Sequence, residues 1–255
     1  MANTRRRRKK SGRRRGKQGC LSTVLFAILF LVALFAAITV FFKIKFIKVV
    51  GAEHYRTDEI IAASDIKTDT NLIFINKFSG VRKIFAALPY VSEVKISRDL
   101  PDTLVIRVVE SRAAAYFRVG RDIWLVDARA KLLEKVSAPS TGIIEIVGVS
   151  PLEPSVGETV KAEDEEKLIT LKTALALFEE KSMTSAVSRL DISGVYDISF
   201  SYLGRFEVKL GMPEDLEYKL DFLGRVIAGL SPEDEGIIDM SGLISTGEVF
   251  FTPTK

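Results

Sequence analysis

Few side chains in this sequence are of the types that carry out chemistry in proteins. His54 is the only histidine and Cys20 the only cysteine of the 255 residues. Ser-His-Asp, Cys-His and histidine-based metal sites would therefore each depend on one residue. His54 follows a glycine turn, where an exposed loop histidine is the ordinary interpretation. The motifs G-x-S-x-G, H-E-x-x-H and G-x-G-x-x-G and the P-loop do not occur.

Two further kinds of site were considered. A Ser/Lys catalytic dyad is not excluded, because both residue types are common here and their spacing in the sequence is unconstrained. The acidic run Glu163–Glu166 suggests a cation site, but Ca²⁺ loops need a turn glycine and alternating ligands. We interpret this run as the solvated start of a helix. The expectation is no enzymatic activity, no cofactor and no metal.

The element around which the chain is organised is an apolar stretch from Leu21 to Phe42. It has no charged residue, and its polar side chains are Ser22, Thr23 and Thr39. As a helix it covers roughly 33 Å, enough for a hydrocarbon core of about 30 Å. A cleaved signal peptide is the alternative. However, the stretch is longer than the apolar region of a typical signal peptide, about 7–15 residues, and no A-x-A cleavage pattern follows it. We predict an uncleaved transmembrane helix over residues 21–42.

The residues before this stretch are strongly basic. Ten Lys or Arg lie between Arg5 and Lys17 with no acid among them, and the first acidic residue is Glu53. The positive-inside rule then keeps the N-terminus in the cytoplasm and exports the rest, as in a single-pass type II protein. The exported part has 27 basic and 33 acidic residues and thus a net charge of −6, so the net charge of +4 for the whole chain is misleading.

Two interpretations of the basic tail compete. An arginine-rich run can bind nucleic acid non-specifically through its phosphates. It can also be a topology signal held against anionic lipid, at about 1 kcal/mol per basic residue. The second is favoured because the tail has no aromatic residue to stack on a base, and because it also explains the adjacent span. We expect no specific nucleic acid, and a disordered cytoplasmic tail over residues 1–20.

Patterns between residues 44 and 112 predict a small α+β module. A β-branched run ends in a glycine turn at Gly51, and a short helix follows with Thr57 as its N-cap. A second helix carries an apolar stripe and stops at a proline, and two alternating strands flank a turn at Pro101. The order is β-α-α-β-β. The predicted stripe is Phe78, Val81, Phe85 and Leu88, and the strands are Phe46–Gly51, Val91–Ser97 and Leu104–Val108.

Residues 113–255 predict a larger β-rich domain with backing helices. Four short strands come first, and a helix from about Ala162 to Lys181 begins with acids that suit its positive N-terminus. A second helix runs from Glu214 to Leu230. Three strands lie between the helices, the last two joined across Leu203-Gly204, and GIIDM and EVFF are the final strands. The fold class expected for the whole chain is α+β.

The order of these elements resembles the bacterial division protein family FtsQ/DivIB, in which the small module is called a POTRA domain. The resemblance rests on FIKVVGAEHYRTDEII, LPYVSEVKISRDLPDTLVIRVVESRAAAYF and WLVDARAKLLE, in this order behind the span. Two positions depart from the family. It usually has proline after the glutamate of V-x-E-R-x-P, where Glu110-Ser111-Arg112-Ala113-Ala114 stands here, and commonly glycine at Arg129 or Ala130. Neither departure touches the fold signal.

This resemblance implies a non-enzymatic scaffold of the divisome in the cytoplasmic membrane of a bacterium, acting in septum formation. The POTRA domain would dock other membrane division proteins. The β domain would bind two single-pass proteins, FtsB (DivIC) and FtsL, through the edge of its closing strands, and tie them to septal peptidoglycan synthesis. Carried over by position, the partner-binding residues are Gly247, Glu248, Val249, Phe250 and Phe251, with Tyr202 and Arg205 on the neighbouring hairpin as weaker candidates.

Alternatives to this interpretation stay open. Val249 and Phe251 are equally well explained as core residues, because alternation along a strand places one face inward. The alternative function is a membrane-anchored envelope hydrolase or protease with an unrecognised Ser/Lys site. A POTRA-bearing export factor for an outer-membrane barrel is disfavoured, because no series of alternating strands of about 10 residues follows the module.

Overall fold

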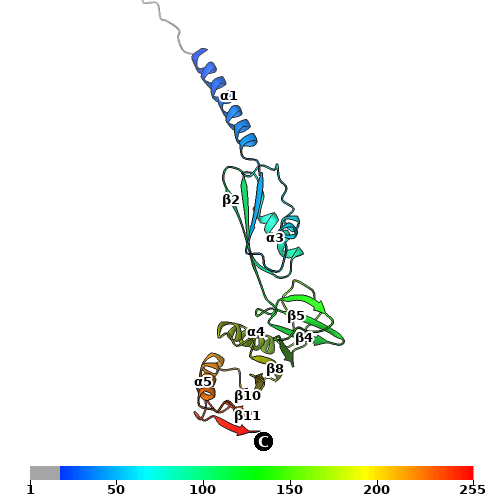
Figure 1. Cartoon of the computed structure of the whole chain (residues 1–255). Coiled ribbons are helices and arrows are strands. Elements are labelled where there is room, and N and C mark those ends of the chain that lie inside the picture. The colour runs from blue at the N-terminus through cyan, green and yellow to red at the C-terminus, as the bar shows by residue number, and fades with distance from the viewer. Residues whose placement is uncertain (1–17, 255) are drawn as a thin grey trace, which may run out of the picture.

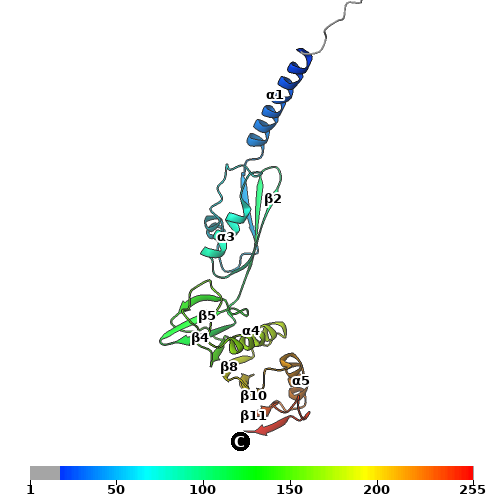
Figure 2. The ribbon, with the colours of Figure 1, turned by 180° about the vertical axis from the view of Figure 1, so that it is seen from behind.

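The molecule is elongated, with α1 at one end and the C-terminus at the other (Figure 1). The computed structural model describes residues 18–254. A small module follows α1 and a large module follows the small one, and the view from behind shows the same order (Figure 2). The basic tail, which is predicted to be disordered, lies in residues 1–17 outside the described part and in the first residues of α1.

Helix α1 (Gln18–Phe41) contains the predicted span. The segment Ser22–Phe41 has a mean hydropathy of 3.0 and is long and apolar enough to cross a membrane. None of that segment is buried against the other described residues. A helix that is apolar all round and uncovered by protein fits a lipid environment, because every backbone group in its interior is hydrogen-bonded internally.

The small module has the predicted order β-α-α-β-β. Its three-stranded sheet has the order β1-β3-β2, with β1 parallel and β2 antiparallel to the central strand β3. The helices supply Ile60 and Ile84 to a core that Ile96, Leu104 and Ile106 complete from the sheet. The elements are β1 (Phe46–Val50), α2 (Thr57–Ser64), α3 (Lys77–Ala87), β2 (Val91–Asp99) and β3 (Thr103–Glu110).

The predicted apolar stripe of α3 is correct for only two of its four residues. Leu88 is buried in the core of the small module, and Val81 packs against that core. Phe78, however, is 82% exposed and Phe85 is 36% exposed. The two phenylalanines were therefore assigned to the wrong face of the helix.

The reason is a glycine that the stripe did not include. Gly80 and Ile84 are the buried residues of α3. A Cβ on Gly80 would come within 3.0 Å of the Ile66 side chain and 3.1 Å of the Ile96 side chain. The glycine thus lets the helix backbone approach the sheet, and the buried face is rotated away from the one that the phenylalanines mark.

The start of α2 also differs from the prediction. Its N-cap is Arg56 rather than Thr57, which is the first helical residue. Glu59 accepts the Arg56 backbone N–H at 3.1 Å, so an acid three residues beyond the N-cap satisfies a backbone group at this end of the helix.

The large module contains one nine-stranded sheet in the order β12-β11-β10-β9-β8-β7-β4-β5-β6. Strands β4, β7 and β8 run parallel to one another. Antiparallel β5 and β6 extend the sheet beyond β4. Beyond β8, β9 and β10 pair antiparallel, β11 pairs parallel with β10, and β12 pairs antiparallel with β11. The strands are β4 (Ala115–Val119), β5 (Asp122–Val126), β6 (Leu132–Val136), β7 (Ile144–Val147), β8 (Val187–Gly194), β9 (Asp197–Tyr202), β10 (Phe206–Gly211), β11 (Gly236–Asp239) and β12 (Phe250–Pro253).

Helices α4 (Glu165–Glu180) and α5 (Leu216–Ala228) lie on the same side of this sheet (Figures 1 and 2). Leu171, Leu175 and Phe178 of α4 and Leu220 of α5 pack with strand residues in one buried cluster. Helix α4 begins at Glu165 instead of Ala162, because the Asp164 side chain caps it by accepting the Lys167 N–H at 3.0 Å. The α+β class is confirmed.

Candidate functional site

The candidate site is the last strand, β12, which occupies one end of the nine-stranded sheet. It pairs antiparallel with β11, and Ile238 lies opposite Phe251. Within the described residues 18–254 no strand pairs with the other side of β12. A terminal strand in this position offers a row of backbone groups to an incoming chain. The site lies at the end of the molecule far from α1 (Figure 1).

The register shows which backbone groups of β12 face outward. Thr254 donates its N–H to Glu235 O at 2.9 Å, so this pair belongs to the hydrogen-bonded set. In an antiparallel ladder such pairs alternate along the strand. Phe250 and Thr252 therefore face β11, and Phe251 and Pro253 face away from it. The outward side offers the N–H and C=O of Phe251 and the C=O of Pro253, since proline has no N–H.

The side chains of β12 give this edge an apolar character. Phe250 is 59% exposed. The half-buried Phe251 packs on the edge of the core, where its ring lies 6.3 Å from the Phe206 ring in a T-shaped contact. A strand added beside β12 would thus find one exposed aromatic side chain and one anchored aromatic side chain on opposite faces.

The residues predicted for this edge are only partly in the strand. Phe250 and Phe251 belong to β12, but Gly247, Glu248 and Val249 lie in the loop before it. Gly247 has a φ of 75°, a left-handed conformation that interrupts an extended strand. The strand continues instead through Thr252 and Pro253, which lie beyond the residues carried over by position. The alternation of Pro253 with Phe251 was the signal that could have included it.

Tyr202 and Arg205 are not on β12. Tyr202 ends β9, which β10 and β11 separate from β12, and burial raises the pKa of its phenol. The Arg205 guanidinium donates to the carbonyls of Ser231, Pro232 and Asp234. Arg205 therefore holds the loop that leads into β11 and, through it, supports the neighbour of β12.

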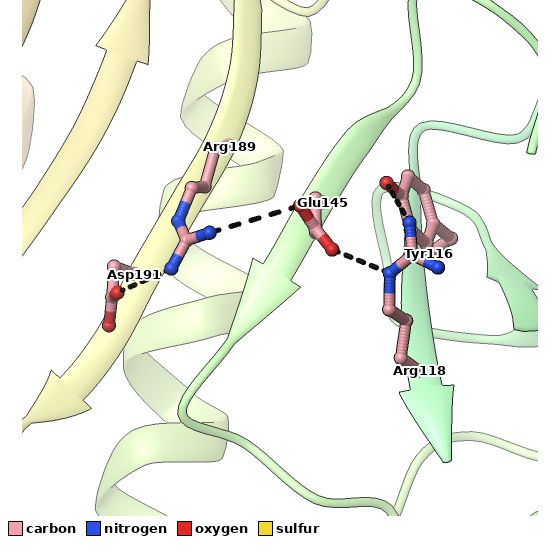
Figure 3. Close-up of polar contacts among 5 residues, drawn as sticks. All are labelled: Tyr116, Arg118, Glu145, Arg189 and Asp191. Atoms are coloured by element: carbon pink, nitrogen blue, oxygen red, sulfur yellow. Dashed lines mark hydrogen bonds and ion pairs between the residues drawn. The ribbon is translucent and has the colours of Figure 1, made fainter. Parts of the chain in front are cut away.

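Charged side chains form a ladder across the middle of the sheet. The ladder lies on the face opposite the one on which α4 packs (Figure 3). Glu145 accepts a hydrogen bond of 2.7 Å from Arg118 and lies 4.0 Å from Arg189, which contacts Asp191 at 3.3 Å. The hydrogen bond that Arg118 donates to Glu145 raises the pKa of Arg118. Burial alone would raise the pKa of Asp191, but hydrogen bonds from Ser193 and Arg189 lower it. The ladder ties β4, β7 and β8 together.

A junction joins the small and large modules. Tyr90 donates its hydroxyl to Glu134 Oε1 at 2.7 Å, and Lys131 Nζ donates to Val91 O at 3.0 Å. Ser111 Oγ donates to Asp127 Oδ2 at 2.8 Å. Burial and the bond to Glu134 both raise the pKa of Tyr90. A cavity of about 530 Å³ lies beside this junction, lined by residues of both modules.

Comparison with known proteins shows which family the chain resembles. The family model "POTRA domain, FtsQ-type" matches residues 42–111, which contain the small module. The cell division protein DivIB of Clostridium botulinum (strain Hall) is 26% identical over 231 residues, covering 88% of this chain and 90% of its own. DivIB of Clostridium acetobutylicum is 26% identical, and the match covers 79% of this chain and 80% of that protein. FtsQ of Corynebacterium glutamicum is 28% identical over 55% of this chain and 64% of its own length. The domain match and relatives that cover most of the chain support the FtsQ/DivIB family.

Similarity to the FtsQ/DivIB family supports a role for this chain in cell division. Its relatives are named for that process, and the candidate span α1 agrees with a single-pass membrane protein. The small module is a POTRA domain of the FtsQ type. A role as a scaffold in division accords with a sheet edge that offers backbone groups for binding.

The single histidine and the buried lysine Lys219 both have structural partners. His54 is exposed, its ring stacks on Tyr90 with centroids 4.0 Å apart, and its backbone N–H donates to Glu110. Lys219 is buried and donates to Leu210 O and Met212 O, and burial lowers its pKa. Among the described residues no group of three or more His, Cys, Asp or Glu is placed to hold a metal ion.

Proposed function

We propose that this chain is a non-enzymatic bitopic scaffold of the divisome that captures an extended segment of FtsB (DivIC)/FtsL-type single-pass proteins along β12. The observation that carries the proposal is the outward register of Phe251 on a terminal strand. Its N–H and C=O form one complete pair for an incoming strand, and Pro253 adds a second acceptor. Through this contact the scaffold would link its partners to septal peptidoglycan synthesis.

The topology proposed for this role follows from the charge of the tail. Ten basic residues before α1 favour a cytoplasmic N-terminus, so both modules lie outside the cytoplasmic membrane. The exported part then consists of a POTRA domain over residues 44–112 and a β domain over residues 113–255. The POTRA domain would dock other membrane divisome components.

The elongated shape adds a requirement on the partner. Because β12 lies at the end of the molecule far from α1, a membrane-anchored partner needs an exported segment long enough to extend past the small module (Figure 1). Confinement of both chains to one membrane raises their effective concentration. Confinement therefore strengthens, in the membrane, a short edge contact that is already measurable in solution.

The test is calorimetry of the full chain in detergent micelles against the exported segments of an FtsB/FtsL pair. Phe251→Pro removes the outward N–H, and we expect it to abolish binding. Phe251→Leu is the matched control, because it keeps the N–H and removes only the aromatic contact with Phe206. We expect Phe251→Leu to keep most of the affinity. Circular dichroism must show that both variants are folded.

Two results would contradict the proposal. Equal binding by Phe251→Pro and the unmodified chain would place the partner elsewhere on the large module. No binding by the unmodified chain would remove the basis for a scaffold of this partner class.

A further inference from the structure

The loop that connects α2 to α3 reaches back along α1. We call residues 71–76 of this loop the tip loop. Phe74 is 60% exposed, and its ring centroid lies 6.0 Å from that of Phe35 in α1. Leu72 donates its N–H to Phe42 O at 2.7 Å just after the helix end. The tip loop therefore lies beside the last turns of the candidate span.

The position of Phe35 gives the depth of this contact. Phe35 precedes the last residue of α1, Phe41, by six residues, which corresponds to about 9 Å along the helix axis. The span Ser22–Phe41 is about 30 Å long, the thickness of a hydrocarbon core. When this segment crosses a membrane, the Phe35 ring lies within the apolar layer, and so does the Phe74 ring beside it.

A loop can enter an apolar layer only when its backbone groups are satisfied by the protein. Asn71 Oδ1 accepts the N–H of Ile73 at 2.8 Å and that of Phe74 at 3.3 Å. Arg98 of β2 donates to Leu72 O at 2.6 Å, and its Nη2 donates to Ile73 O at 2.9 Å. Two side chains thus satisfy backbone groups at the apex of the tip loop.

The same asparagine also joins the tip loop to α1. Asn71 Nδ2 donates at 3.0 Å to Ile38 O in the last turn of the helix, a carbonyl that also accepts the Phe42 N–H at 3.2 Å. A side chain that bonds to the span and to the loop fixes one relative to the other. The loop is held at its depth by hydrogen bonds as well as by the ring contact.

Two further exposed apolar side chains lie at this end of the small module. Leu100, in the β2–β3 turn, is 57% exposed, and Phe46, at the start of β1, is 59% exposed. Lys45 donates its N–H to Asp102 O at 2.8 Å, which brings the turn next to the chain that leaves α1. The side chains of Lys45 and Asp102 also form an ion pair of 3.2 Å here, so charged groups suited to the lipid headgroups lie beside the apolar ones.

We propose that the tip loop enters the leaflet nearest the small module and that lipid acyl chains cover Phe74. Lipid is the occupant because the tip loop continues the apolar surface of α1, which lies uncovered by the other residues in 18–254. The small module is then fixed to the membrane at two points, the end of α1 and the tip loop, and cannot swivel about the helix end. This inference is independent of partner binding at β12.

The test uses single-tryptophan variants of the full chain in vesicles of phosphatidylcholine and phosphatidylglycerol. Trp124→Phe removes the only native tryptophan. Phe74→Trp then reports on the tip loop, and Phe35→Trp is the control inside the span. Ile169→Trp is the matched aqueous control, because Ile169 is 63% exposed on α4 in the large module.

We expect lipids brominated in the upper part of one acyl chain to quench the Phe74→Trp variant as strongly as the Phe35→Trp variant and several-fold more than the Ile169→Trp variant. The tip-loop tryptophan should also emit at shorter wavelength than the aqueous control and resist quenching by aqueous iodide. The proposal would be overturned if the Phe74→Trp variant matched the Ile169→Trp variant in quenching by brominated lipid, in emission wavelength and in quenching by iodide. The tip loop would then be a surface for a protein partner.

Discussion

The hydroxyl of Tyr90 and the carboxylate of Glu134 meet at 2.7 Å across the junction of the two modules. Tyr90 is 8% exposed, and its ring also stacks on His54 of the small module. One side chain therefore belongs to both modules. A rigid connection of this kind determines where β12 lies relative to the membrane.

We predict that Tyr90→Phe lowers the free energy of unfolding by about 1 kcal/mol, because the hydrogen bond is lost while the ring remains. Thermal unfolding of the full chain in detergent, followed by circular dichroism, measures the change. Tyr196→Phe is the control, since Tyr196 is 69% exposed and donates no side-chain hydrogen bond among the described residues. Equal unfolding temperatures for the two variants would show that the junction bond contributes nothing.

Alkaline titration tests the environment of the same residue. Burial raises the pKa of Tyr55, Tyr90 and Tyr202 above the ordinary value near 10. The fold favours the neutral phenol, so this contribution to stability is complete below pH 10 and is lost as pH rises toward the folded-state pKa. Absorbance titration of phenolate should therefore show a late component, which Tyr90→Phe reduces. A titration complete by about pH 11 without unfolding would contradict it.

Gly148 and Gly157 provide a matched pair, because both have a φ of 88°. A Cβ at Gly148 would lie 2.2 Å from Ser193 N on β8, whereas nothing lies within 4 Å of a Cβ at Gly157. We predict that Gly157→Ala costs about 1–2 kcal/mol from backbone strain alone. Gly148→Ala should cost several kcal/mol more, because it separates β7 from β8. Chemical denaturation measures both, and a similar loss in each would refute the clash.

The charge ladder predicts a salt-dependent effect. Glu145→Gln removes the charge that Arg118 and Arg189 share, and we expect a fall of no more than a few degrees in unfolding temperature at low salt. The difference from the unmodified chain should shrink at high salt, because screening weakens partly exposed pairs. Glu207→Gln is the control, as Glu207 is exposed on β10 and forms no ion pair in the described part of the chain. If the fall in unfolding temperature of Glu145→Gln did not change with salt, its cause would be lost side-chain packing and not a lost charge.

The sequence predicted the order of elements better than their faces. Strand alternation in β3 placed Leu104, Ile106 and Val108 correctly in the core, because a period of two leaves little choice. In α3 the two phenylalanines indicated the wrong face. The decisive residue was Gly80, whose lack of a side chain permits close packing and gives no apolar signal.

The candidate site was predicted less completely. Phe250 and Phe251 were placed in the last strand, but which amide faces outward depends on the pairing with β11, which the sequence does not contain. No sequence pattern indicated the tip loop, because its conformation depends on Asn71 and Arg98, which lie far apart in the chain. Contacts between distant segments of this kind leave no local pattern.

Pro253 limits what the end of the sheet can accept. An edge with one outward donor suits a single guest strand and is a poor template for repeated stacking of identical chains, since each new layer would lack the same hydrogen bond. Two copies of this chain placed edge to edge would therefore gain little. The proline thus disfavours the growth of fibres through this edge of the sheet.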